Sequence, residues 1–161
     1  MPIRSSFAYL TIILSRAKSL MILFVTCGIP GSGKTTLAKK LSQEYNLTLY
    51  SYDELKANRR LEWGRLSTYI LGLVRQSLTA NQNVIIDNLY ITKESRCKLL
   101  SDISDIPCKK ILIALQTPLE ECKARDKSRT SHYLGARTID RFNDEYESPT
   151  VDEGWDEIVY Y

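Results

Sequence analysis

One segment near the N-terminus limits the fold more than any other feature of the 161-residue chain. Residues 20–27 (LMILFVTC) form a continuous apolar run that ends at a glycine, which is typical of a strand buried on both faces of a parallel sheet. Residues 28–34 are rich in glycine, and helical spacing of apolar side chains follows over 35–45. The segment therefore predicts a buried strand, a tight loop and a helix in direct succession.

The loop of this segment, residues 28–35, reads GIPGSGKT and fits the phosphate-binding pattern G-x-x-x-x-G-K-[ST]. Its glycines let successive N–H groups turn inward and let phosphate oxygens approach, while the helix N-terminus adds partial positive charge. We expect Lys34 to neutralise the β- and γ-phosphates and the Thr35 hydroxyl to enter the coordination shell of Mg²⁺. The loop thus predicts ATP and Mg²⁺ as cofactors, although nucleotide binding alone defines no reaction. The residues expected to contact the nucleotide are Gly28, Ile29, Pro30, Gly31, Ser32, Gly33, Lys34, Thr35, Thr36 and, from a later helix, Arg125.

The rest of the chain alternates between strand and helix patterns. Strands are predicted at 47–51, 84–87, 110–115 and 157–161, and helices at 53–80 with a break near Trp63, 92–103, 119–127 and 136–146. This alternation predicts a three-layer α/β/α P-loop NTPase fold with a parallel sheet of about five strands. The active site then belongs at the carboxyl ends of the strands. The polar segment 128–135 lacks apolar periodicity and is predicted to be a mobile lid.

Domain organisation follows from length. A chain of 161 residues suits one compact domain, which we place at 21–161. Residues 1–20 form an N-terminal extension in which 7–14 (FAYLTIIL) are apolar but too few to cross a bilayer. No membrane association is expected, and Met21 is a possible functional start. The extension is either dispensable or a small added element, and oligomeric state is not predicted.

Charge is distributed unevenly along the chain. Residues 144–161 contain seven acids and no Lys or Arg, which leaves 22 basic against 12 acidic residues in 1–143, a balance of +10. A body of this charge suits polyanionic ligands, either nucleotides or nucleic acid, and a solvated basic surface is the alternative. The cysteines, Cys27, Cys97, Cys108 and Cys122, lack metal-ligand spacing, so we interpret them as reduced packing thiols of a cytosolic protein.

Candidates for the acceptor side follow the second and third strands. Asp53 lies 19 positions after Lys34 and is either the general base for an attacking hydroxyl or the cap of the following helix. Asp87 closes the strand VIID as a Walker B aspartate does, and either holds a Mg²⁺-bound water or an acceptor hydroxyl, or ends the strand in a turn. Asn88 and Arg96 are predicted to extend the acceptor wall, with a surface helix position as the alternative for Arg96.

Two arginines and several aromatic residues complete the candidates. Arg125 and Arg129 are one helical turn apart, so both can face the lid, where an arginine would stabilise the transferring phosphoryl group. A solvated basic face shared with nearby lysines is the alternative. Tyr52 and Tyr90 are candidates for stacking on a nucleobase, whereas the tryptophans, Trp63 and Trp155, are interpreted as core or interface residues.

Taken in order, these motifs resemble those of the polynucleotide 5′-hydroxyl kinases, a family of P-loop kinases related to zeta toxins and AAA-like kinases. The shared elements are GxPGSGKT, an Asp after the second strand, VIIDN with an Arg nine residues after its Asp, and RDKSR at 125–129. The stretch 142–161 is similar to the F-x-x-x-x-E-x-P-T-x-x-E-G ending of the animal polynucleotide kinase/phosphatase. The resemblance runs from residue 21 to 161.

The resemblance implies transfer of the γ-phosphate of ATP to a 5′-hydroxyl of DNA or RNA in nucleic-acid repair. It implies Asp53 as general base, Arg129 as lid arginine, and an acceptor side formed by Lys56, Asp87, Asn88 and Arg96. The chain departs from the family at Tyr52, where Arg is common, and at Lys56, where the phage enzyme has Arg, so acceptor specificity is less defined. The alternatives are a kinase of a small molecule or an aminoacyl-tRNA, and a regulatory NTPase module.

Overall fold

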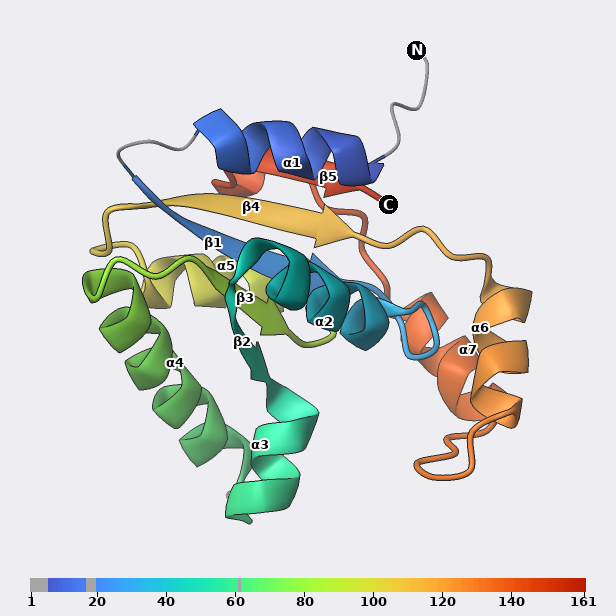
Figure 1. Cartoon of the computed structure of the whole chain (residues 1–161). Helices are drawn as coiled ribbons and strands as arrows, with labels where there is room; N and C mark the ends of the chain where they lie inside the picture. Colours follow the sequence, from blue (N-terminus) through green and yellow to red (C-terminus); the bar gives the residue numbers. More distant parts are fainter. Residues whose placement is uncertain (1–5, 17–19, 61) are drawn as a thin grey trace.

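The computed structural model describes residues 6–16, 20–60 and 62–161. Five parallel strands form one sheet in the order β2-β3-β1-β4-β5, with helices on both faces (Figure 1). The predicted three-layer α/β/α fold with five parallel strands is therefore confirmed. The strands are β1 (Met21–Cys27), β2 (Thr48–Ser51), β3 (Val84–Asp87), β4 (Cys108–Ala114) and β5 (Glu157–Tyr160). The helices are α1 (Ser6–Arg16), α2 (Lys34–Tyr45), α3 (Tyr52–Arg59), α4 (Trp63–Thr79), α5 (Lys93–Asp102), α6 (Leu119–Lys127), α7 (Ala136–Asp144) and the 3₁₀ turn η1 (Val151–Glu153).

Strand β1 lies at the centre of the sheet and is buried on both sides, as its continuous apolar sequence predicts. Ile22 and Phe24 pack in one apolar cluster with residues of α1 and α2. Leu23 and Val25 pack in a second cluster with residues of α4 and α5. Because successive side chains of a strand alternate between faces, one strand holds both helical layers together. The loop after β1 is therefore attached to the most firmly packed part of the molecule.

The N-terminal segment contains a helix that the sequence did not predict. Leu10 and Ile13 of α1 are 0% and 7% exposed and belong to the same apolar cluster as Phe24. The apolar run at 7–14 is thus part of an element that covers the sheet, while residues 1–5 and 17–19 lie outside the described residues. Within the described residues, no helix combines the length and apolar character needed to cross a membrane.

The helix predicted at 53–80 is two helices. Arg60 adopts a left-handed conformation (φ 53°), and its N–H donates to the carbonyl of Lys56, which ends α3. Helix α4 begins at Trp63, so the break lies before the tryptophan and not between Trp63 and Gly64. In Figure 1, α3 begins at the end of β2, and the corner between α3 and α4 projects below the sheet.

The acidic C-terminal segment packs against basic groups of the body. Asp152 lies 3.4 Å from Lys93, and Glu157 lies 2.8 Å from Lys109. The Asp156 carboxylate accepts a hydrogen bond of 2.7 Å from the Lys110 N–H. The acids of this segment thus compensate lysines beside α5 and β4. Among the described residues, no ion pair joins these C-terminal acids to the basic residues beside the phosphate-binding loop.

Candidate active site

The phosphate-binding loop connects β1 to α2 at the carboxyl edge of the sheet. Gly31 and Gly33 have φ values of 83° and 97°, in the left-handed region that favours glycine. A Cβ at Gly31 would also collide with the carbonyl oxygen of Cys122 on α6. Gly33 is the N-cap of α2, so the first N–H groups of that helix open onto the loop. The glycines of the motif are therefore needed for backbone shape and for close packing under α6.

Lys34 is held inside this loop. Its Nζ donates to the carbonyl of Ile29 at 2.8 Å and to the hydroxyl of Ser32 at 3.4 Å, and the residue is 7% exposed. Burial disfavours the charged form and lowers the pKa of Lys34 to about 8, against an opposing effect of the Asp87 carboxylate. A phosphate group arriving in the loop would restore the stability of the ammonium form.

This environment predicts a proton uptake on nucleotide binding. With the pKa of Lys34 at about 8 in the free protein and raised by phosphate, ATP binding at or just above that pH should take up a proton at Lys34. ATP affinity should then fall as pH rises above about 8. Calorimetry in two buffers of different ionisation enthalpy measures the uptake. In Lys34→Arg, which stays protonated, the uptake should vanish, and an equal uptake in both proteins would contradict the assignment.

Asp87 lies at the centre of a group of hydroxyls beside the loop. Its Oδ2 accepts from the Thr35 hydroxyl at 2.7 Å and from the Ser51 hydroxyl at 3.2 Å, and its Oδ1 accepts from the Thr26 hydroxyl at 3.4 Å. Ser51 and Asp87 are register partners at the ends of β2 and β3. Of the roles open to Asp87, this contact with Thr35 favours the metal side over the acceptor side.

The oxygen atoms of Thr35 and Asp87 have the chemistry that Mg²⁺ prefers. They lie within hydrogen-bond distance of each other beside Lys34, next to the N-terminus of α2. These residues fit the metal that the phosphate-binding loop implies. Thr35 would be a direct ligand, and Asp87 would hold a water of the ion or the ion itself.

A cavity of about 750 Å³ opens beside the loop. It is lined by Gly31–Gly33 and the start of α2 on one side, and by residues 115–118 and Tyr161 on the other. Arg125 and Arg129 stand together in its wall. This is room for a nucleotide next to the phosphate-binding loop. Arg125 of α6 and Arg129, two residues beyond the end of that helix, thus line the same cavity.

Arg125 also braces the loop from outside. Its guanidinium donates to the carbonyls of Gly31 and Ser32 at 3.4 and 3.2 Å and forms an ion pair with Glu121. The Thr117 hydroxyl donates to the Ser32 carbonyl at 2.8 Å. Helix α6 and the segment before it therefore hold the outer side of the phosphate-binding loop in place. Among the described residues, no hydrogen bond joins the Arg129 side chain to this loop.

Asp126, between the two arginines, is a site residue that sequence reasoning missed. It is 1% exposed, and its carboxylate accepts from the N–H groups of Leu134 at 3.2 Å and Gly135 at 3.0 Å. These hydrogen bonds attach the C-terminal end of the 128–135 segment to α6. The signal was present in RDKSR, where an acid stands among four polar or basic residues, but its partners are backbone groups that no motif names.

Asp53 is the second residue of α3 and is exposed. The N-cap of α3 is Ser51, so Asp53 does not cap this helix. Its neighbour Glu54 pairs with Lys39 of α2 at 2.6 Å, which holds the start of α3 against the helix that follows the phosphate-binding loop. Among the described residues, no hydrogen bond or ion pair engages Asp53. A carboxylate at this place is available to an incoming hydroxyl.

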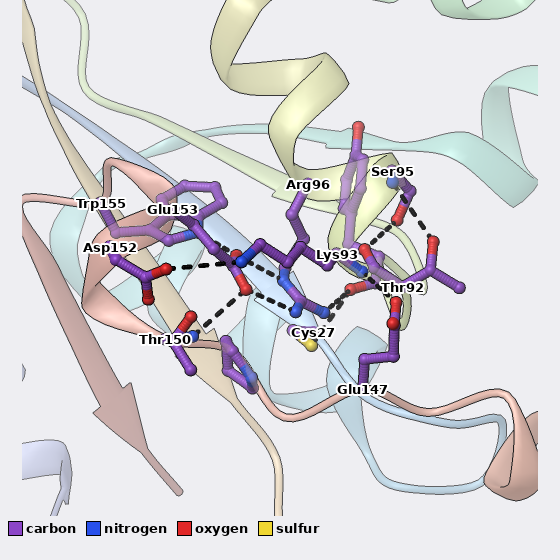
Figure 2. Close-up of polar contacts among 12 residues, drawn as sticks. Cys27, Thr92, Lys93, Ser95, Arg96, Glu147, Thr150, Asp152, Glu153 and Trp155 are labelled. Atoms are coloured by element: carbon purple, nitrogen blue, oxygen red, sulfur yellow. Dashed lines mark hydrogen bonds and ion pairs between the residues drawn. The ribbon is translucent and has the colours of Figure 1, made fainter.

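Arg96 is not on an acceptor wall. Its side chain is fully buried, its Nε and Nη2 donate to the two oxygens of Glu153 at 2.8 and 2.7 Å, and its Nη1 donates to the Tyr90 carbonyl at 3.1 Å (Figure 2). The same glutamate accepts from the Trp155 indole at 3.1 Å. Burial alone would raise the pKa of Glu153, but the hydrogen bonds from Arg96 and Trp155 hold that pKa below its usual value. The expectation of an acceptor contact for Arg96 is therefore corrected: the arginine anchors the C-terminal segment.

Burial also contradicts the sequence expectation for two tyrosines. Tyr52 and Tyr90 are 4% and 8% exposed and meet edge to face with their ring centroids 6.3 Å apart, so neither ring is open to a nucleobase. Trp63, interpreted from the sequence as a core or interface residue, is 50% exposed and therefore lies outside the core. Asn88 is half-buried, with its N–H donating to the Thr26 hydroxyl at 3.2 Å, and remains a candidate for the acceptor side. Lys56 places its Nζ 3.7 Å from the centroid of the Trp63 ring.

All four cysteines are free thiols. Cys27, Cys108 and Cys122 are buried, and burial raises the pKa of each. The Cys27 thiol donates to the Tyr90 carbonyl at 3.2 Å, beside Arg96. These thiols are packed groups of low reactivity.

The sequence matches a family model described as an AAA domain (AAA_33) over residues 23–149, and the chain belongs to this family. No curated protein sequence matches the chain significantly. The matched region begins inside β1 and includes the phosphate-binding loop, Asp53, Asp87 and both arginines.

Solved structures share the fold. A sugar kinase from Janibacter sp. HTCC2649 aligns with a TM-score of 0.68 and 19% identity over 88% of this chain and 84% of that chain. Chaetomium thermophilum Kti12 in complex with ADP-AlF3 aligns with a TM-score of 0.68 and 18% identity over 86% and 88% of the two chains. A fungal RNA kinase aligns with a TM-score of 0.65 and 18% identity over 87% and 73%. The chain therefore shares its fold with these proteins.

Proposed function

We propose that this protein transfers the γ-phosphoryl group of ATP to the 5′-hydroxyl of a polynucleotide. The observation that carries the proposal is the position of Asp53, an exposed carboxylate two residues beyond Ser51, whose hydroxyl contacts the same Asp87 that binds Thr35. Donor groups and a candidate base thus meet at the carboxyl ends of β2 and β3. The resemblance of the motifs to polynucleotide 5′-kinases, and the shared fold with a fungal RNA kinase, support the acceptor class.

In the proposed reaction, the 5′-oxygen attacks the γ-phosphorus while Asp53 takes the hydroxyl proton. The bond from the γ-phosphorus to the β,γ-bridging oxygen breaks, and ADP leaves with that electron pair. Lys34 and the N–H groups of the loop neutralise charge on the β- and γ-phosphates, and Arg129 stabilises charge on the group in transfer. Mg²⁺ at Thr35 and Asp87 would supply further neutralisation of the phosphates when bound. Because ATP is the donor, we expect the protein to act in the cytoplasm.

Arg129→Ala tests the role of the lid arginine. Since Arg129 lines the cavity without bracing the loop as Arg125 does, its loss should lower the turnover number about 10-fold or more and raise the KM for ATP less. Steady-state kinetics of ADP formation with a saturating acceptor separate the two effects. Lys127→Ala, an exposed change at the last residue of α6 and two positions before Arg129, is the matched control. Equal losses in turnover and ATP affinity would indicate ground-state binding only.

A kinase of a small molecule or of an aminoacyl-tRNA is the second candidate, because the sugar kinase has the same fold. A transfer assay with 5′-hydroxyl oligonucleotides of DNA and RNA beside nucleosides, sugars and seryl-tRNA distinguishes the candidates. The proposal predicts phosphorylated oligonucleotides at the lowest acceptor concentration. Transfer to small molecules alone would exclude it.

A further inference from the structure

The corner between α3 and α4 combines basic and aromatic side chains on the outside of the molecule. Residues 56–65 contain four basic residues and a single acid, Glu62. Trp63 is 50% exposed, although it is the largest apolar side chain of the corner. In Figure 1, α3 and the N-terminal end of α4 lie side by side and project away from the sheet.

The helical pattern of α4 explains why Trp63 is exposed. Leu66, Ile70 and Val74 form its buried stripe, and Trp63 continues the stripe by one turn toward the N-terminus. At that turn the ring meets Lys56 of α3. A half-exposed indole gains free energy when another group covers it, so it is available for a further contact.

Cations hold the aromatic rings of this corner in place. The Nζ of Lys56 lies 3.7 Å from the centroid of the Trp63 ring, and the guanidinium carbon of Arg59 lies 5.2 Å from the centroid of the Tyr69 ring. Both distances are within the range of cation–π attraction. The indole is therefore oriented before any ligand arrives and has a positive charge against its ring.

The corner begins on the same helix as Asp53, the candidate base. Asp53 and Lys56 are three residues apart on α3, which places them on one side of the helix about 4.5 Å apart along its axis. Glu54 turns to Lys39, so the nearest acid beside Asp53 is already paired. An acceptor whose terminal hydroxyl reached Asp53 would pass Lys56 and Trp63 next.

We infer that Trp63 is a stacking platform for a base near the 5′ end of a single-stranded nucleic acid acceptor, with Lys56, Arg59 and Arg60 facing its phosphates. This inference rests on the proposed function. We choose a nucleic acid as the ligand of this surface for two reasons. Its phosphates complement the basic side chains, and each of its bases can stack on an aromatic ring. A stacking platform of this kind binds single-stranded nucleic acid in preference to duplex and discriminates little between the bases.

Tryptophan fluorescence gives a direct test, since Trp155 is 5% exposed and bonded to Glu153 and so provides an unresponsive background. A short single-stranded 5′-hydroxyl oligonucleotide, added without ATP, should quench the wild-type emission. Trp63→Phe should keep binding, measured by the anisotropy of a labelled oligonucleotide, and lose the quenching. Quenching that persists in Trp63→Phe would overturn the inference.

Trp63→Leu keeps an apolar side chain but removes the aromatic face. Its Kd for the oligonucleotide should rise about 10-fold, with the KM for ATP and the melting temperature unchanged. Lys56→Gln should reduce the salt dependence of binding by about 0.7 in the slope of log K against log salt for each phosphate that is no longer neutralised. Wild-type binding by Trp63→Leu, in an enzyme that phosphorylates the same oligonucleotide, would overturn the platform and leave the proposed function standing. A wild-type protein that shows the quenching but transfers no phosphate would overturn the proposed function instead.

Discussion

Asp53→Asn is expected to lower the turnover number about 100-fold or more and to leave the affinity for ATP unchanged. The amide is close to the carboxylate in size, so the start of α3 should keep its shape. It cannot accept the proton of the attacking hydroxyl, and among the described residues no hydrogen bond or ion pair joins Asp53 to the phosphate-binding loop. Single-turnover measurement of phosphate transfer, beside ATP binding by calorimetry, checks both parts of the prediction.

The control for Asp53→Asn is Glu54→Gln, the adjacent carboxylate on the same helical turn. Glu54 pairs with Lys39 at the surface, where such pairs contribute little, so this change should reduce turnover only slightly. If Asp53→Asn turned over as the wild type does, Asp53 would not be the base. The regulatory NTPase alternative would then gain support.

The largest effect on stability is expected for Arg96→Met. The substitution leaves the Glu153 carboxylate buried with only the Trp155 indole and the Thr150 N–H as donors. Removing one partner of a buried ion pair typically costs about 3–5 kcal/mol of unfolding free energy. Urea unfolding followed by circular dichroism measures the loss. Because the pair joins α5 to the segment before β5, the C-terminal segment should also become sensitive to proteolysis.

Two variants separate the buried pair from general effects of charge. Lys98→Ala removes an exposed pair with Asp102 on the same helix and should cost less than about 1 kcal/mol. The double variant Arg96→Met with Glu153→Gln should recover part of the loss, because no uncompensated charge remains. A loss for Arg96→Met no larger than that for Lys98→Ala would contradict the burial of this pair.

The sequence predicted the elements whose signals are local. Strand β3 (Val84–Asp87) and helix α6 (Leu119–Lys127) have the predicted bounds, and β1 begins one residue later than predicted. The exact position of the break before α4 and the presence of the helix α1 were not predicted. The break depends on the left-handed Arg60, a conformation that no glycine signals there. Helix α1 depends on the sheet surface that it covers, and that surface exists only in the folded chain.

Side-chain positions were predictable where a motif fixes both the place in the chain and the local backbone. Lys34 and Thr35 face the loop because their spacing from the glycines leaves no other geometry. Arg96 was misassigned because its partner, Glu153, is 57 positions away, and sequence spacing does not show which side of α5 is buried. Because sequence spacing does not show which side of a helix is buried, the aromatic residues were also misassigned. Tyr52 is buried, and Trp63 is the exposed ring.

The balance between ADP and phosphorylated acceptor is the strongest test of a polynucleotide kinase activity. Wild-type protein with ATP, Mg²⁺ and a saturating 5′-hydroxyl oligonucleotide should form one 5′-phosphorylated end for each ADP, and ADP formation should nearly stop without the oligonucleotide. Mass spectrometry of the oligonucleotide and chromatography of the nucleotides give both quantities in one sample. ADP that accumulates at the same rate with and without oligonucleotide, with no phosphorylated end, would contradict the proposed activity.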